Sequence, residues 1–190
     1  MHSHVVDLYH EHLNPYLAKL MGFAGFGLED HADGCYVYDH EGKSYLDCLG
    51  GYGVFSLGHR HPRVVEAVKA QLDRMPLGSK VFFSPVQAEL AGKLAEIAPG
   101  NLEFAFFCNS GAEACEAALK FAKGATGRSK IVSTFGGFHG KTLGALATTG
   151  KEKYRAPFNP LMPGVEFVQF GNLNALSAID GETSAFIVEP

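Results

Sequence analysis

Several features that define common protein classes are missing from this sequence. No apolar run approaches the roughly 20 residues that a membrane-spanning helix needs, because Gly, Pro or a charged residue interrupts each one. The first residues lack the basic and apolar segments of a secretion signal. The formal net charge is −4, without the Lys/Arg excess that nucleic-acid binders usually carry. We therefore expect a cytoplasmic protein that binds neither membrane nor nucleic acid.

Signatures of disulfide, metal and nucleotide sites are also missing. The four cysteines form no CxxC pair and fit no zinc spacing, so we expect reduced thiols. Histidines gather near the start, at positions 2, 4, 10 and 12, but no carboxylate or thiolate is fixed beside them, and we predict no metal site. Neither a Walker A motif nor a dinucleotide fingerprint occurs, which disfavours a nucleotide-binding module.

The first third of the chain combines short helices with a hairpin. The 190 residues are 46% apolar, enough for one sizeable core. Apolar residues recur at near-helical spacing over residues 5–21, and Pro15 opens a second helix there. Strand-forming runs at 35–38 and 44–47 flank a Gly-containing turn and predict a β-hairpin. Residues 49–61 hold four glycines and predict no helix.

From residue 62 the pattern changes to helices and strands in alternation. Pro62 and the pair Ser84-Pro85 each open a helix. Strands are then predicted at 103–108, 130–134, 166–170 and 185–189, and helices at 112–123, 141–149 and 173–179. Repeated β-α-β order with apolar strands predicts an α/β fold with a mostly parallel sheet and flanking helices. Because the sequence ends directly after a strand, we expect it to be a piece of a longer protein.

The first chemical motif is a turn between a predicted strand and a predicted helix, with the sequence CNSGAEA over residues 108–114. The free N–H groups of a first helical turn converge on the positive end of the helix dipole, which suits an anion such as phosphate. Gly111 lets the backbone approach an anion, and Ser110 adds a hydroxyl. The same turn is equally compatible with a plain serine-capped helix.

A second motif follows the next strand, with the sequence FGGFHGKT over residues 135–142. Loops after parallel strands meet at the carboxyl edge of the sheet, where open α/β sheets bind ligands. An aromatic ring and an imidazole between glycines suit a flat heterocycle. A loop histidine with a half-buried phenylalanine is the plainer interpretation.

Taken together, the two motifs resemble the class III pyridoxal-phosphate (PLP) aminotransferases, a fold-type-I family. Three more segments share the resemblance: YLD at 45–47, GHRHP at 58–62 and VEP at 188–190. It implies a PLP-dependent transferase fold with a large α/β domain and a smaller domain, assembled as a homodimer. Residues 62–190 would be the first part of the large domain, and residues 1–61 the N-terminal part of the small one.

The resemblance also assigns cofactor-binding residues. It places Ser110, Gly111 and Ala112 around the PLP phosphate, Phe138 on the pyridine ring, His139 beside that ring, and Glu189 near the cofactor. It puts the lysine that forms the Schiff base, and the aspartate that keeps the pyridine nitrogen protonated, beyond Pro190. We therefore expect no catalytic residue within the chain, and no transaminase activity from these 190 residues alone.

The implied reaction moves an amino group from an amine to a 2-oxo acid such as 2-oxoglutarate. Segments 47–55 and 157–164 look most like putrescine aminotransferases, which indicates a diamine or ω-amino acid donor. Lys141 stands where acetylornithine enzymes carry an arginine that looks like a carboxylate holder, and lysine lacks its bidentate fork.

Other activities remain open. Within the family they are aminotransferases of the acetylornithine, ornithine or 4-aminobutyrate type, or a racemase, aminomutase or decarboxylase on the same scaffold. Outside it, a truncated product without catalysis is the alternative.

Overall fold

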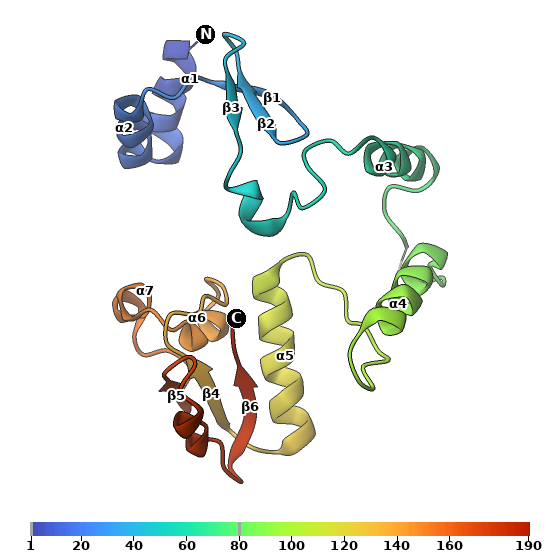
Figure 1. Cartoon of the computed structure of the whole chain (residues 1–190), viewed down its shortest axis with the longest axis vertical. Helices are drawn as coiled ribbons and strands as arrows, with labels where there is room; N and C mark the ends of the chain where they lie inside the picture. The colour runs from blue at the N-terminus through green and yellow to red at the C-terminus, as the bar shows by residue number, and fades with distance from the viewer. Residues whose placement is uncertain (1, 80) are drawn as a thin grey trace. The chain divides into compact units, whose positions relative to one another are not determined.

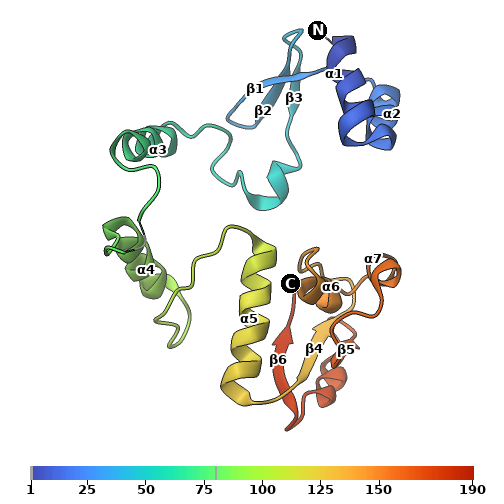
Figure 2. The ribbon, with the colours of Figure 1, turned by 180° about the vertical axis from the view of Figure 1, so that it is seen from behind.

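The computed structural model describes residues 2–79 and 81–190. The chain divides into two units, Met1–Ser84 and Pro85–Pro190, and each is described by itself. Figures 1 and 2 show their elements from opposite sides. The expected domain boundary after residue 61 concerns a complete fold and stays a prediction.

The first unit opens with helices that Pro15 divides, as predicted. The Asn14 side-chain oxygen accepts hydrogen bonds from the backbone N–H groups of Tyr16 and Leu17, both at 3.1 Å, so it caps the helix that Pro15 begins. The helical elements of this unit are α1 (His2–Leu8), the π-helical η1 (Tyr9–Leu13), α2 (Pro15–Ala24), the 3-10 turn η2 (Gly50–Gly53) and α3 (Pro62–Arg74).

The predicted hairpin is confirmed, and a third strand joins it. The antiparallel sheet has the order β1 (Glu29–Asp33), β2 (Tyr36–Asp39), β3 (Ser44–Leu46). Asp39 fixes the hairpin turn, because one carboxylate oxygen accepts from the N–H groups of Glu41 and Lys43 at 3.0 Å. The sequence did not predict β1, whose residues EDHAD are polar and lack strand propensity.

The second unit is an α/β layer around a three-stranded parallel sheet. Its elements are α4 (Pro85–Ile97), α5 (Gly111–Thr126), β4 (Lys130–Thr134), α6 (Leu143–Thr148), α7 (Glu152–Arg155), the 3-10 turn η3 (Ala156–Phe158), β5 (Val165–Val168), the 3-10 turn η4 (Leu173–Ala178) and β6 (Thr183–Ile187). Both β5 and β6 pair with β4 in parallel, in the order β5-β4-β6, so the predicted parallel sheet is confirmed.

The core of this unit lies on the central strand. Ile131 and Val132 of β4 are fully buried, and so is Ala145 of α6. Figure 1 shows α5 running beside β6, with α6 beyond the carboxyl ends of β4 and β6. The sequence located β4 correctly because Ile131, Val132 and Thr134 are β-branched residues that favour strands. The same packing brings the loops that follow β4 and β6 to one edge.

Three predicted elements differ from the structure. The strand predicted at 103–108 is wrong: this segment is irregular, Phe104 is almost fully exposed, and no described strand pairs with it. Apolar composition cannot supply a strand without a hydrogen-bonding neighbour. The helix at 173–179 is the 3-10 turn η4, and β6 ends at Ile187, so Glu189 lies just past the strand.

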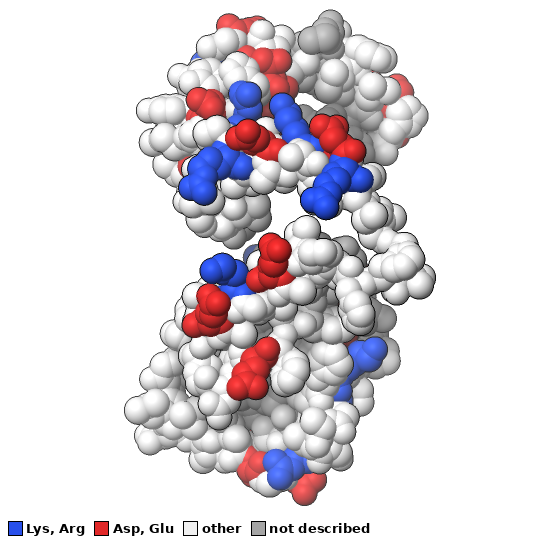
Figure 3. Space-filling model, turned by 90° about the vertical axis from the view of Figure 1, so that its right-hand side faces the viewer, with Lys and Arg blue, Asp and Glu red and all other residues white. Residues whose placement is uncertain are grey.

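Charges of both signs are mixed on the surface that Figure 3 shows. Large apolar side chains are also exposed in both units, Phe23, Phe83 and Phe104 among them. Over the residues that the structure describes, no helix is both long and apolar enough to cross a membrane.

Candidate functional site

The amino end of α5 is built as the sequence predicted. Ser110 is the N-cap, and its hydroxyl oxygen accepts from the Glu113 N–H at 3.2 Å. Glu113 in turn accepts from the Asn109 N–H at 2.7 Å, so the turn is held from both sides. The N–H groups of Gly111 and Ala112 belong to the first turn, where a helix offers no acceptor. A side chain added at Gly111 would meet open space. The first turn of α5 therefore offers free backbone N–H donors, and the space beside Gly111 is open.

The loop after β4 carries Phe138 and His139. The Phe138 N–H donates to the Glu189 carboxylate at 2.9 Å, and the His139 N–H donates to the Thr149 hydroxyl at 3.1 Å. Gly150 anchors the loop further, because its carbonyl accepts from the Gly136 N–H at 3.2 Å. Two separate segments, one at Thr149 and Gly150 and one at Glu189, thus fix the backbone that displays the aromatic ring.

The two side chains of this loop differ in exposure. Phe138 is 42% exposed, and its ring meets that of Tyr154 edge-on, with centroids 6.4 Å apart. His139 is only 8% exposed, and its Nε2 has no hydrogen-bond partner. Burial lowers the pKa of His139, although the Glu189 carboxylate acts in the opposite direction. The imidazole is therefore a neutral, buried group, and Phe138 offers a free ring face.

The two motifs touch. Gly140 has a φ of +135°, and a Cβ added there would lie 2.7 Å from the Cβ of Ala112. Only glycine fits at this contact, which brings the Phe138–His139 loop against the first turn of α5. Glu189 joins the same edge through its bond to Phe138. All six residues assigned by the sequence therefore gather at one edge of the sheet.

Other residues of this site were not found from the sequence. Glu116, Thr149, Gly150 and Tyr154 all hold the loop after β4 or the helix that follows it. Glu116 is one helical turn beyond Ala112, and that spacing is the only local signal that it faces the same side. Lys141 is exposed and follows Gly140 directly.

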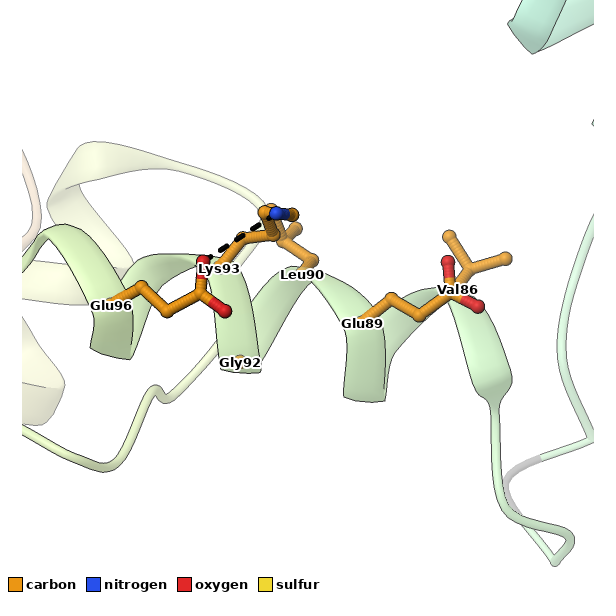
Figure 4. Close-up of a pocket in the computed structure, with 6 residues that line it drawn as sticks. All are labelled: Val86, Glu89, Leu90, Gly92, Lys93 and Glu96. Atoms are coloured by element: carbon orange, nitrogen blue, oxygen red, sulfur yellow. Dashed lines mark hydrogen bonds and ion pairs between the residues drawn. The ribbon is translucent and has the colours of Figure 1, made fainter.

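A surface hollow elsewhere in this unit does not compete with this edge. It runs along one side of α4 and is lined by Val86, Glu89, Leu90, Gly92, Lys93 and Glu96. Figure 4 shows that all six residues belong to the same helix, and Lys93 and Glu96 form an ion pair at 3.5 Å. A hollow with a single wall encloses no ligand, whereas binding sites are concave and converge polar groups.

Proteins with similar sequences include aminotransferases. The sequence model of the family Aminotransferase class-III matches residues 27–190. An acetylornithine aminotransferase of Archaeoglobus fulgidus is 52% identical over 161 residues, which cover 84% of this chain and 42% of that protein. This chain thus spans less than half the length of that curated relative.

Solved structures with the same fold include further aminotransferases. A taurine:2-oxoglutarate aminotransferase of Bifidobacterium kashiwanohense, in complex with PLP and glutamate, superposes with a TM-score of 0.85 at 25% identity, over 100% of this chain and 48% of that one. An (S)-enantioselective ω-transaminase of Thermomicrobium roseum gives 0.78 at 31% identity, over 95% of this chain and 44% of that one.

The ornithine aminotransferase of Toxoplasma gondii gives a TM-score of 0.77 at 26% identity, over 92% of this chain and 45% of that one. The two loops at the sheet edge, the parallel β5-β4-β6 order and the family match over 27–190 agree with one another. The chain belongs to the class-III aminotransferases, and its second unit is part of their PLP-dependent fold type I.

Proposed function

We propose that this chain is the N-terminal part of a PLP-dependent aminotransferase that moves an amino group from an amine to a 2-oxo acid. The observation that carries the proposal is the contact between Gly140 and Ala112. It sets free helix donors and an exposed aromatic ring at one edge of a parallel sheet, the arrangement that a phosphorylated flat ring needs.

The residues present fit PLP. Gly111 and Ala112 would bind the phosphate through their N–H groups, and the uncovered Gly111 leaves room for its oxygens. Ser110 adds its hydroxyl at the same turn. Phe138 would stack on the pyridine ring, and His139 would lie beside it as a neutral group. When bound, PLP supplies the electron sink that amino-group transfer requires.

Glu189 orients the loop in this proposal. Its carboxylate accepts from the Phe138 N–H, so the end of β6 holds the backbone that carries the ring. The lysine that binds the cofactor covalently is proposed to follow residue 190. Lys141 is a poor substitute, because it is exposed and lies two residues before α6 begins at Leu143. The homodimer and the cytoplasmic location expected from the sequence remain proposals of the same kind.

Two donor classes are in question. The sequence motifs favour a diamine such as putrescine, and Lys141 in place of arginine weakens recognition of an acylated amino acid's carboxylate. The 52% identity to an acetylornithine aminotransferase favours N-acetylornithine as the second candidate. Both donors present a primary amine at the end of a short alkyl chain, so both can be assayed as substrates of the same active site.

The test is an amine screen on the whole protein with 2-oxoglutarate as acceptor, with glutamate as the measured product. We expect the absorbance of bound PLP and a higher kcat/KM for putrescine than for N-acetylornithine. Lys141→Arg should raise the relative rate with N-acetylornithine. A higher kcat/KM for N-acetylornithine in the unchanged protein would overturn the diamine assignment. A protein that neither retains PLP nor forms glutamate from any amine would overturn the proposal that it is an aminotransferase.

A further inference from the structure

The carboxylate of Glu116, on helix α5, caps the amino end of helix α6. Glu116 lies in the second turn of α5, and one of its oxygens accepts from the backbone N–H groups of Gly144 at 2.9 Å and Ala145 at 3.1 Å. Thr142 also hydrogen-bonds this carboxylate through its side chain. These three residues form the start of α6, directly after the Phe138–His139 loop.

Within the described residues, no other side chain caps the first N–H groups of α6. Thr142 is the N-cap of α6, but its side chain bonds no backbone N–H of the helix. Ala145 is fully buried, so its N–H cannot be satisfied by bulk water. A side chain at Gly144 would collide with the Glu116 carboxylate, and the helix therefore approaches as closely as a glycine allows.

The carboxylate is also held in its charged form. Burial would raise the pKa of Glu116, but the hydrogen bonds from Thr142, Ala145 and Gly144 outweigh it and hold that pKa below its usual value. Lys120, one turn further along α5, adds a favourable charge. Charged acceptors make stronger hydrogen bonds than neutral ones, so this cap is firm.

The cap lies between the two halves of the proposed PLP site. On α5, Glu116 follows the Ser110–Ala112 turn. On the other side, α6 follows the loop whose Gly140 rests against Ala112. The loop and the start of α6 are thus held against α5 at two points, by packing at Gly140 and by hydrogen bonds at Gly144 and Ala145. Removing the second point frees the loop to shift relative to α5.

We propose that Glu116 is a positioning residue that sets the distance between the phosphate donors of Gly111 and Ala112 and the ring face of Phe138. This inference rests on the proposed function. It explains how one molecule is bound at both ends: a single CH2–O link joins the phosphate of PLP to its ring and limits their separation, so both contacts form together only if the two loops keep their spacing.

The test compares PLP with pyridoxal, which has the ring but no phosphate. In the whole protein, both dissociation constants are measured by absorbance for the unchanged sequence, Glu116→Ala and Glu116→Gln. We expect Glu116→Ala to weaken PLP about tenfold, the size of a lost pair of hydrogen bonds, and pyridoxal much less. Glu116→Gln keeps an acceptor oxygen and should stay within about twofold.

The ratio of the two affinities separates positioning from general stability. A residue that only stabilised α6 would weaken both ligands equally, and this outcome, or an unchanged PLP constant in Glu116→Ala, would overturn the inference. Glu96→Ala is the matched control, because Glu96 is an exposed glutamate on α4 that pairs with the exposed Lys93 of the same helix. It should leave both constants unchanged.

A second variant covers the case in which Glu116→Ala does not fold. Glu116→Asp keeps the charge but is one methylene shorter, so it should lower the PLP-to-pyridoxal affinity ratio in the same direction. An unchanged ratio in a folded Glu116→Asp would overturn the inference. If the unchanged protein binds PLP no better than pyridoxal, the phosphate site fails, and the proposed function falls together with this inference. Tight PLP binding with an unchanged ratio in the variants removes only the role of Glu116.

Discussion

The backbone N–H of Phe138 donates to the Glu189 carboxylate at 2.9 Å, across 51 residues of sequence. This bond ties the loop after β4 to the segment after β6, although the two strands are joined by a long crossover. The negative charge of the same carboxylate raises the pKa of His139, against the larger effect of burial, which lowers it. One side chain therefore orients the backbone of the aromatic residue and tunes the neighbouring imidazole.

Removal of this carboxylate should weaken cofactor binding without unfolding the protein. In Glu189→Ala the Phe138 N–H loses its acceptor, and we expect PLP affinity to fall about tenfold, the lower end of what one hydrogen bond to a charged group contributes. Glu189→Gln retains an acceptor oxygen and should bind PLP nearly as well as the unchanged protein. Titration of PLP absorbance in the whole protein measures both. Equal losses in the two variants would show that the charge, and not the bond to Phe138, is what matters.

The phosphate assignment predicts a strong effect at Gly111. Gly111→Val would place a branched side chain in the open space before the first-turn donors, and PLP affinity should fall tenfold or more, which is about 1.4 kcal/mol. Gly124→Val is the control on the same helix, because a side chain at Gly124 also meets open space but lies near the other end of α5. Isothermal titration of PLP should separate the two variants. Equal affinity in both would remove Gly111 from the phosphate site.

The contact between Gly140 and Ala112 predicts a loss of stability. Gly140→Ala adds a Cβ 2.7 Å from that of Ala112 at a φ of +135°, so both crowding and backbone strain oppose it. We expect the free energy of unfolding to fall by about 1–3 kcal/mol, measured by urea denaturation. Gly136→Ala is the comparison, since Gly136 also has positive φ, at +89°, but open space around it. If the two variants lose the same stability, the backbone conformation alone explains the glycine at 140.

Acid should destabilise the second unit through His139. Burial makes the pKa of His139 lower in the folded than in the unfolded chain, so below about pH 6.5 the unfolded state takes up a proton first. The free energy of unfolding should therefore keep its full value above that pH and decrease as the pH falls towards the pKa that His139 has in the folded state. His139→Gln should show a flatter dependence between pH 7 and 5 in urea denaturation. Parallel curves for the two proteins would contradict a buried neutral imidazole.

Local signals in the sequence identified much of this site. The Ser110 cap, the strand at 130–134 and the loop at 135–140 follow from residue types and spacing that act over a few positions. The parallel β-α-β order places the loops after β4 and β6 at one edge, because loops after parallel strands meet there. Ser110 follows no strand of the structure, so its place beside Phe138 and Glu189 was predicted by the family resemblance and not by the strand order.

Interactions between distant segments were not predictable in this way. Glu116 looks like an ordinary exposed position of an amphipathic helix until the start of α6 is placed against it. The run at 103–108 is as apolar as a buried strand, but pairing decides whether a strand forms, and no described strand lies beside it. The strand β1 shows the reverse case, since pairing with β2 imposes a strand on the polar residues 29–33.

The order of strands in the second unit has a consequence for its synthesis. The central strand β4 leaves the ribosome before both of its neighbours, since Ile131 pairs with Val165 and Ala185. At about 5–20 residues per second, the most deeply buried strand of the sheet waits for seconds without a neighbouring strand to pair with. During that interval Ile131 and Val132 are available to a chaperone or to another nascent chain, and the amount of folded protein depends on the speed of translation between residues 135 and 187.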